Sequence, residues 1–203
     1  MTKDRIVEAA RSLMTRHGWV GTTIEAIARE AGVATATVYA AFGNKRSILT
    51  AMRQHMIDQS QIPRLMAEAA SEPDRRRRLR LWAQLIRQQM ETSYDIIAIH
   101  REAAQSDADV GIAYRAVLDN RARAFAEFIA PIRPALTPGV DEDTATDLLW
   151  AFSNEELWRE LVHERGWSPD RYEGWLGDVL IEQLLGRRSR THSQRTGTDE
   201  ADA

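Results

Sequence analysis

The chain contains no cysteine, which excludes disulfide bonds, thiol catalysis and cysteine-ligated metals. Histidine is scarce too, and of the five present only His163 has a glutamate, Glu160, three residues before it. A metal-dependent four-helix oxidase needs that Glu-x-x-His spacing on each of two helices, so half of its site is absent. Glycine-rich phosphate loops and the Gly-x-Ser-x-Gly elbow are also missing. We therefore expect no enzyme, no metal and no cofactor.

Long hydrophobic runs are absent as well. No segment approaches the roughly 18 uncharged apolar residues of a membrane span. The amino end, MTKDRIVEAARS, alternates charges where a signal peptide has an apolar core. We expect a cytoplasmic protein with no membrane partner. A hydrophobic content of 43% in 203 residues still provides a core for one large or two small domains.

Basic residues are slightly fewer than acidic ones, and they are unevenly placed. The net charge is −3, yet residues 1–50 hold seven lysines and arginines against four acidic residues, a balance of +3. The rest of the chain therefore carries −6. A basic first quarter on an acidic body predicts that one end of the molecule meets a polyanion.

What the chain does have is helical spacing of apolar residues in almost every segment, without strand-like alternation, so we expect an all-α fold. Two short helices should follow a first helix at residues 3–17. The second starts near Thr22, which stands at capping-box spacing from Glu25, and the third covers residues 35–42.

Beyond residue 58 the helices lengthen. Pro63 and Pro73 mark a connection, and the three prolines of APIRPALTPG interrupt the helical pattern again. Long helices are expected over residues 74–92, 94–104, 108–130, 141–165 and 169–186. This division predicts a first domain over residues 1–57, a larger helical domain over 58–186, and a polar, disordered tail over 187–203.

A short helix, a glycine-containing turn and another short helix at about residues 22–42 form a helix-turn-helix arrangement for DNA. Small side chains let both helices approach a nucleic acid, and Thr35 and Thr37 offer hydroxyls to a groove. Asn44 can cap a fourth helix whose first residues are Lys45 and Arg46. Cations are disfavoured at a helix amino terminus, so an anion such as a DNA phosphate is expected there.

These residues resemble the tetracycline-repressor-like (TetR) family of transcriptional regulators. The resemblance lies in IVEAARSLMTRHGWVGTTIEAIAREAGVATATVYAAFGNKRSIL, about a quarter of the chain, where the "TT", "IA..AGV", "TxY..F" and Lys-to-Leu elements occur in order. It implies a three-helix DNA-binding domain followed by a larger ligand-binding and dimerisation domain. It also implies that the DNA contacts are Thr23 and Tyr39 at phosphates, Thr35, Ala36 and Thr37 in the groove, and Lys45 as a phosphate clamp.

The chain departs from the family pattern at three positions. Ala34 stands where a capping serine is usual, Ala36 where glycine is usual, and Ala41 where a tyrosine or histidine often touches the DNA backbone. The weakened cap should cost the third helix roughly 1 kcal/mol unless Thr35 takes it over.

In the long helices the resemblance implies an internal effector cavity, with Tyr94, His100, Arg101 or Asn154 as polar anchors. For any one of its apolar residues, ordinary core packing is the favoured alternative. The candidate lining residues are Trp82, Ile86, Met90, Tyr94, Ile97, His100, Arg101, Tyr114, Leu118, Phe125, Trp150 and Asn154.

The last helix has an apolar stripe wide enough to face both its own domain and a second copy of the chain. With the helix before it, it resembles the helix pair through which the family dimerises; internal packing is the alternative. The candidate interface residues are Leu148, Phe152, Tyr172, Trp175, Leu176, Val179 and Leu180. The run Arg75–Arg78 is interpreted as a solvated helix start paired with Glu72 and Asp74, not as a second DNA contact.

Together these features predict a homodimeric regulator, most simply a repressor, that binds a palindromic operator in double-stranded DNA. An unknown small-molecule effector would release it. Two alternatives stay open: a body that binds a protein partner instead of a ligand, and a metal-dependent helical-bundle enzyme.

Overall fold

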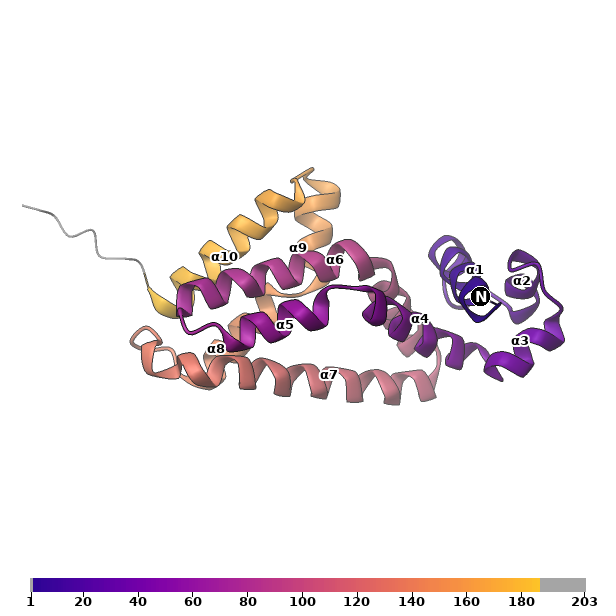
Figure 1. Cartoon of the computed structure of the whole chain (residues 1–203), viewed down its shortest axis with the longest axis horizontal. Helices are drawn as coiled ribbons and strands as arrows, with labels where there is room; N and C mark the ends of the chain where they lie inside the picture. The colour runs from indigo at the N-terminus through magenta and orange to yellow at the C-terminus, as the bar shows by residue number, and fades with distance from the viewer. Residues whose placement is uncertain (1, 187–203) are drawn as a thin grey trace, which may run out of the picture.

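The structure, a computed structural model, describes residues 2–186, without the side chain of Gln59. These residues form helices and no strand, which confirms the all-α prediction. Figure 1 shows a small head at one end, made by α1 (Thr2–His17), α2 (Ile24–Glu30) and α3 (Thr35–Phe42). Helix α4 (Lys45–Gln59) leads from the head into a body of longer helices. The tail predicted over 187–203 lies outside the described residues.

The two short helices of the head begin close to where the sequence places them, with one correction. Thr23, not Thr22, caps α2, because its side chain accepts a hydrogen bond from the backbone of Ala26 at 3.2 Å. The Thr22 side chain is buried and donates to the Gly18 carbonyl at 2.8 Å, so it closes the end of α1 instead. Because α2 begins at Ile24, Thr23 and not Thr22 occupies the N-cap position.

The predicted cap of α4 is confirmed. Asn44 accepts from the backbone of Ser47 at 2.9 Å, and α4 begins at Lys45. Helix α3 has no such cap, since Ala34 occupies the position and no side chain bonds there. Helix α3 therefore depends on packing, and Val38 is its fully buried side chain.

The head core extends into the body. Apolar residues of α1, α2 and α4 pack in one cluster with Ile96, Ile99, Ala103 and Val110, which belong to body helices. The boundary predicted between residues 57 and 58 falls inside α4. Head and body thus share one helix and part of one core, so the orientation of α4 determines how the head lies relative to the body.

The first body helices correct two expectations. The stretch expected to be a connection contains α5 (Ile62–Ser71), with Pro63 in its first turn, where a missing backbone N–H costs nothing. The helices expected over 74–92 and 94–104 are one, α6 (Arg75–Ser106). No glycine or proline separates them, and the Thr92 hydroxyl donates back to the Gln88 carbonyl at 2.8 Å within the helix. Helix α7 (Ala108–Ile129) agrees closely with the prediction.

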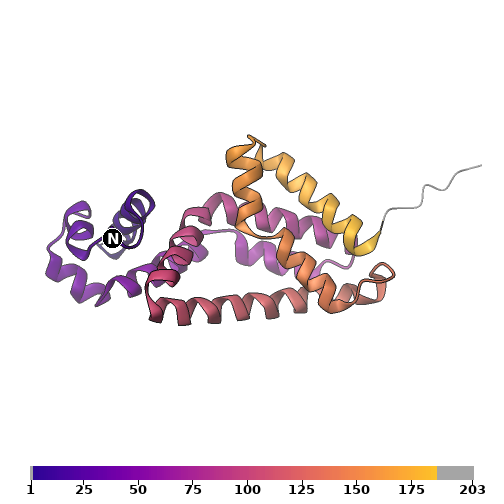
Figure 2. The same cartoon turned by 180° about the vertical axis from the view of Figure 1, so that it is seen from behind.

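A short 3₁₀ helix, η1 (Ala130–Ala135), follows α7 at the proline-rich break. The helix predicted over 141–165 is divided into α8 (Glu142–Phe152), α9 (Glu155–Trp158) and the π-helical η2 (Arg159–Glu164). Asn154 starts the new helix by accepting from the backbone of Leu157 at 3.1 Å. Helix α10 (Pro169–Leu185) ends the described chain, and Figure 2 shows α8, α9 and α10 following one another on one side of the body.

The body core lies between α6, α7 and α10. Trp82 packs edge-on against Phe125 at 4.8 Å between ring centroids, and its indole donates to the Ser153 hydroxyl at 3.0 Å. Arg78 is buried and donates to the Phe128 carbonyl at 3.1 Å, while Arg77 pairs with Glu72 at 2.8 Å.

The basic run at residues 75–78 therefore serves the fold. The pairing of Arg77 with Glu72 agrees with the expectation, whereas the burial of Arg78 corrects the prediction of a fully solvated run. Among the described helices none is long and apolar enough for a membrane span.

Candidate nucleic-acid interface and ligand cavity

Helix α3 lies at the outer end of the head, away from the body (Figure 1). Val38 points into the head core, whereas Ala36, Thr37 and Tyr39 are exposed and Thr35 is half-buried. Tyr39 exposes 49% of its surface, which is unusual for a tyrosine with core available beside it. The face carries threonine hydroxyls, alanines and one exposed phenol. Because most of these side chains are small, the helix can enter a DNA groove on this face.

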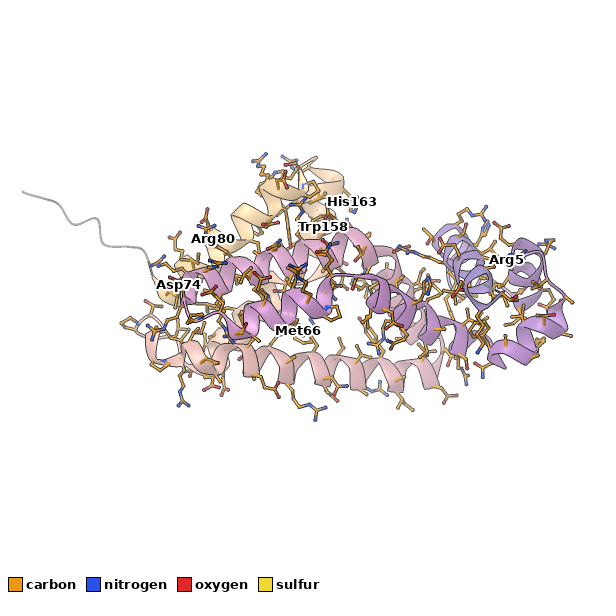
Figure 3. All side chains as sticks on the ribbon, in the orientation of Figure 1. Arg5, Met66, Asp74, Arg80, Trp158 and His163 are labelled. Carbon is orange, nitrogen blue, oxygen red and sulfur yellow. The ribbon has the colours of Figure 1, made fainter. Side chains whose placement is uncertain are left out.

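The turn between α2 and α3 is held by the first helix. The Arg5 guanidinium, labelled in Figure 3, donates to the carbonyl of Ala31 at the end of α2. Gly32 follows with φ of +64°, and a Cβ there would lie 3.0 Å from the Arg5 side chain. Glycine is favoured here chiefly by its positive φ, since the flexible Arg5 side chain could shift away from a Cβ. The angle between α2 and α3 is therefore fixed by three separate segments of the chain.

Thr23 is exposed at the start of α2. Its oxygen accepts from the Ala26 backbone, which leaves its hydroxyl hydrogen available to an outside acceptor.

Lys45 is bound within the head. Its ammonium donates to the carbonyls of Trp19 at 2.6 Å and Thr22 at 2.8 Å, and it lies 4.2 Å from the centroid of the Trp19 ring. Burial lowers the pKa of Lys45, and the acidic Asp107 and Glu102 oppose that shift. Two of the three ammonium hydrogens thus hold the turn between α1 and α2.

Arg46 meets carboxylates of the body. It pairs with Asp107 at 2.8 Å and also with Asp109, at the start of α7. These two carboxylates supply the anion that a basic helix start requires, in the place where a DNA phosphate was expected.

Further polar contacts connect the head to the carboxyl-terminal half of α6. Arg11 of α1 makes a two-pronged contact with Asp95, at 2.6 and 2.8 Å. Glu102 accepts from the backbone of Trp19 at 3.0 Å, and it lies so close to Gly18 that a Cβ there would be 2.6 Å from the carboxylate. A shift of α6 must therefore move the turn that precedes α2.

A cavity of about 350 Å³ lies between α4, α5, α6 and α7. A neighbouring one of about 220 Å³ shares Arg53, His100 and Tyr114 with it and reaches Arg46 and Asp109 at the junction. Each of the four helices contributes a row of lining residues along one of its faces. The lining residues of the larger cavity are Arg53, Met56, Ile57, Ile62, Pro63, Met66, Gln89, Ile96, Ile97, His100, Tyr114, Val117, Leu118 and Arg121.

Four of the predicted pocket residues, Ile97, His100, Tyr114 and Leu118, line this cavity. Arg121 also lines the cavity but was not predicted from the sequence. Tyr114, Leu118 and Arg121 stand at i, i+4 and i+7 on one face of α7, so helical spacing could have identified it. The stripes from α4 and α5 were missed because α5 itself was not expected.

The other predicted pocket residues do not line the cavity, because they pack in the core or bond to neighbouring residues. Trp82, Ile86, Met90 and Phe125 are core residues. Tyr94 packs on His163 at 5.0 Å between ring centroids. The remaining three also have structural partners: Arg101 pairs with Glu155 and Glu156, Asn154 caps α9, and Trp150 stacks against Arg121.

The predicted dimer residues separate into two groups. Tyr172, Leu176 and Leu180 are fully buried within their own chain, so their assignment to an interface is corrected. They face α6, whose apolar side chains cover them. Leu148, Phe152, Trp175 and Val179 of α8 and α10 are half-buried, and the first three also pack against the body core.

Within the described residues no group of three or more metal-ligating side chains could hold an ion. His163, the one histidine with the oxidase spacing, accepts from the Trp158 indole at 3.1 Å.

The fold and this head define a class: a helix-turn-helix DNA-binding domain carried on a larger helical body. Residues 6–52 match the family described as bacterial regulatory proteins, tetR family. The head of this chain therefore matches a family of transcriptional regulators, as its sequence predicts.

A curated relative is the HTH-type transcriptional regulator HbdR of Aromatoleum sp. (strain CIB), 36% identical over 83 residues. That match covers 40% of this chain and spans 36% of the length of HbdR. Two solved structures share the fold over 91% of this chain and 98% of theirs. They are FadR of Bacillus subtilis in complex with stearoyl-CoA, 18% identical with a TM-score of 0.70, and a regulator of Saccharomonospora viridis in complex with choline, 23% identical with a TM-score of 0.72.

Proposed function

We propose that the chain is a homodimeric, ligand-responsive transcriptional regulator whose α3 helices read a palindromic operator. The observation that carries this proposal is the outer face of α3, where Thr37 and Tyr39 are exposed on a helix anchored by a single buried side chain. A helix so short gains little from its own backbone and is held rigidly only by the head around it. Rigid presentation of small polar side chains suits the major groove.

The contacts to DNA divide into two kinds. Thr35, Ala36 and Thr37 are proposed to face base edges, while Thr23 and Tyr39 meet phosphates. Lys45 has one ammonium hydrogen left for a phosphate after its two carbonyl contacts. Phosphate contacts position a protein on the duplex, and base contacts provide its specificity.

Dimerisation is proposed through the outer faces of α8 and α10. Leu148, Phe152, Trp175 and Val179 are the predicted residues that the chain's own core leaves half-exposed there. A two-fold dimer would place two α3 helices in successive major grooves, with half-sites about 34–36 Å apart. Changing Val179 to glutamate should give folded monomers in sedimentation. Ile112→Glu is the matched control, since Ile112 is an apolar residue 61% exposed on α7.

The cavity is proposed to be the effector site. Solved relatives in fold carry ligands as different as stearoyl-CoA and choline, which favours a small molecule over a protein partner. The cavity borders α6, and the neighbouring smaller one reaches the Arg46 contacts with Asp107 and Asp109. An effector that fits only one arrangement of α4 and α6 would shift the head. The coupling requires a difference in affinity between the two arrangements.

Repression is the simplest outcome, because occupancy of an operator is by itself enough to block transcription. Selection of bound fragments from genomic DNA with the purified protein tests the proposal. We expect enrichment of an imperfect palindrome with half-sites one helical turn apart, and a reporter behind it that is silenced by the protein. Fragments with no shared motif would contradict the operator, and a reporter that is switched on would contradict repression.

A further inference from the structure

We propose that the cavity takes an anion with an aliphatic body, of the medium-chain carboxylate or alkyl phosphate kind. The inference rests on the proposed function, because it names the chemical class of the effector for the same site. Its starting point is the charge of the wall: Arg53 of α4 and Arg121 of α7 are the charged residues in the described lining, and no carboxylate is among them.

Arg121 is a cation held in place without a counter-charge. One of its terminal nitrogens donates to the Ser153 carbonyl at 2.5 Å, and its guanidinium lies 5.0 Å from the Phe125 ring centroid and 4.8 Å from that of Trp150. The nearby carboxylate of Glu155 is engaged by Arg101 at 3.0 Å. Burial lowers the pKa of Arg121, which reflects the cost of removing its charge from water. An arginine stays protonated in proteins, so a ligand that brings a negative charge relieves that cost.

Arg53 adds the second charge to the cavity wall, from α4. It is half-buried and makes no hydrogen bond or ion pair with another described residue. The adjoining His100 adds no charge, since burial and the Arg53 cation lower its pKa to about 4. Two guanidinium groups with free donors on separate helices match the oxygens of one carboxylate or phosphate.

The remainder of the wall selects the body of the ligand. Most of the lining is aliphatic or methionine, including Ile57, Ile62 and Leu118, and the aromatic rings among the described lining residues are those of Tyr114 and His100. A quaternary ammonium ligand requires a cage of several rings or a carboxylate. Met66, labelled on α5 in Figure 3, lines the cavity yet exposes 44% of its surface, so the cavity opens at this helix. At about 350 Å³ the site is near the lower end of the usual range of about 300–1,000 Å³, which suits a single short chain.

Titration calorimetry with four probes of equal chain length tests the proposal on the full chain: decanoate, decyl phosphate, decanol and decylamine. We expect both anions to bind at least about tenfold more tightly than decanol, the equivalent of one charge-assisted hydrogen bond. Decylamine should bind more weakly than decanol. The order of decanoate and decyl phosphate then distinguishes the two head groups.

Arg53→Met should remove most of the preference for the anions and leave the affinity for decanol unchanged. The variant should fold, because Arg53 holds no other described residue. Arg121→Lys keeps the charge but loses the planar fork, so it should reduce the preference without abolishing it. Arg123→Met is the matched control, an exposed arginine of α7 whose contact is with Asn120 and not with the cavity.

Equal affinity for decanoate and decanol, tighter binding of decylamine, or no binding of any probe would overturn the ligand class. Operator release measured with the same four probes separates this result from the proposed function. If decanol releases the operator as well as decanoate does, the effector site stands and the anion preference is wrong. If decanoate binds with the expected preference while the operator stays bound, the ligand class stands and ligand-controlled release is wrong.

Discussion

Helices α3 and α10 both carry residues that sequence pattern marks for contact with a partner, DNA in one case and a second subunit in the other. On α3 the marked positions Thr37 and Tyr39 lie outside and only Val38 is fully buried. On α10 the marked positions Leu176 and Leu180 are fully buried in their own chain, and only Trp175 and Val179 reach the surface.

The contrast shows how helix length and side-chain size affect such an inference. Helix α3, with eight residues, buries Val38 fully and Ala41 and Phe42 in part, which leaves the face with Thr37 and Tyr39 exposed. A helix of 17 residues with a wide apolar stripe first satisfies its own core, and what is left over is the interface. On α3, therefore, the residues proposed to bind DNA should differ from those that stabilise the fold. On α10 the same apolar stripe should contribute both to stability and to dimerisation.

The largest expected effect tests the inner face of α10. The stripe taken alone predicts that Leu176→Glu and Leu180→Glu produce monomers, but their burial predicts loss of the fold. A glutamate at Leu176 would bury a carboxylate among Tyr172 and the α6 side chains, and should lower the free energy of unfolding by at least about 3 kcal/mol in urea titrations.

Val179→Glu is the matched change on the outer face of the same helix. It should lower the free energy of unfolding of the monomer by less than about 1 kcal/mol relative to the unchanged monomer, because a half-exposed glutamate keeps its charge in water. Dimerisation should weaken nonetheless, as measured by sedimentation at several concentrations. Equal destabilisation by both changes would show that α10 has no distinct outer face.

The next effect concerns specificity on α3. Thr37→Ala should reduce discrimination between operator and random DNA by about 1–3 kcal/mol if the hydroxyl touches a base edge. Stability should stay the same or rise slightly, since Thr37 is exposed and alanine favours helix more. Thr15→Ala, at an exposed position of α1, is the control for a threonine away from the groove. If both DNA affinities drop equally, Thr37 contacts the backbone and reads no base.

Lys45 lies between the two cases, because its ammonium contacts the protein and is proposed to contact DNA. Lys45→Ala removes its hydrogen bonds to Trp19 and Thr22 and should cost about 1–2 kcal/mol of stability. A merely solvated lysine would instead leave the protein slightly more stable, since a cation would leave a helix start.

Its role at a phosphate has a separate readout. If Lys45 meets DNA, the slope of log affinity against log salt should become shallower by about 0.9 in Lys45→Ala. Arg46→Ala should leave that slope unchanged, because Arg46 pairs with Asp107 and Asp109. An unaltered slope with reduced stability would make Lys45 a support for the turn before α2 and nothing more.

The head could be predicted nearly residue by residue, because its signals are local. Asn44, Gly32 and the apolar spacing of α1 each act within a few residues of their own position, and α3 begins and ends where they imply. The exception is Thr22, whose hydroxyl goes to Gly18 across the turn, so the cap moved to Thr23. Arg46 was misplaced for a related reason, since its anions come from α7.

The body could be predicted only as a set of helices. Which face of a long helix is core and which lines a cavity depends on neighbours far away in sequence. Trp82 was a reasonable cavity residue until Phe125 and Ser153 proved to enclose it. Arg53 was missed because α4 was assigned wholly to the head, although its last two turns face α5, α6 and α7 around the cavity. Tertiary packing, not helix propensity, decides these positions.

The smallest expected effect has the opposite sign and returns to α10. The Tyr172 ring is fully buried, and its hydroxyl finds no hydrogen-bond partner among the described residues. Burial raises the pKa of that hydroxyl, so it stays protonated. On folding it loses its hydrogen bonds to water and gains none from the described residues. Removing an unsatisfied buried group should be neutral or favourable, so Tyr172→Phe should change the free energy of unfolding by no more than about 1 kcal/mol, in the stabilising direction.

The same variant tests the contrast between the two faces once more. An interface role for Tyr172 would require its hydroxyl to reach the second subunit, and Tyr172→Phe would then weaken the dimer while leaving the monomer intact. Packing of Tyr172 against Trp158, 5.0 Å away between ring centroids, is retained by phenylalanine. Unfolding in urea and sedimentation of the same sample therefore separate the readings. A loss of stability or of dimer would mean that the hydroxyl has a partner after all, and that the inner face of α10 is not purely core.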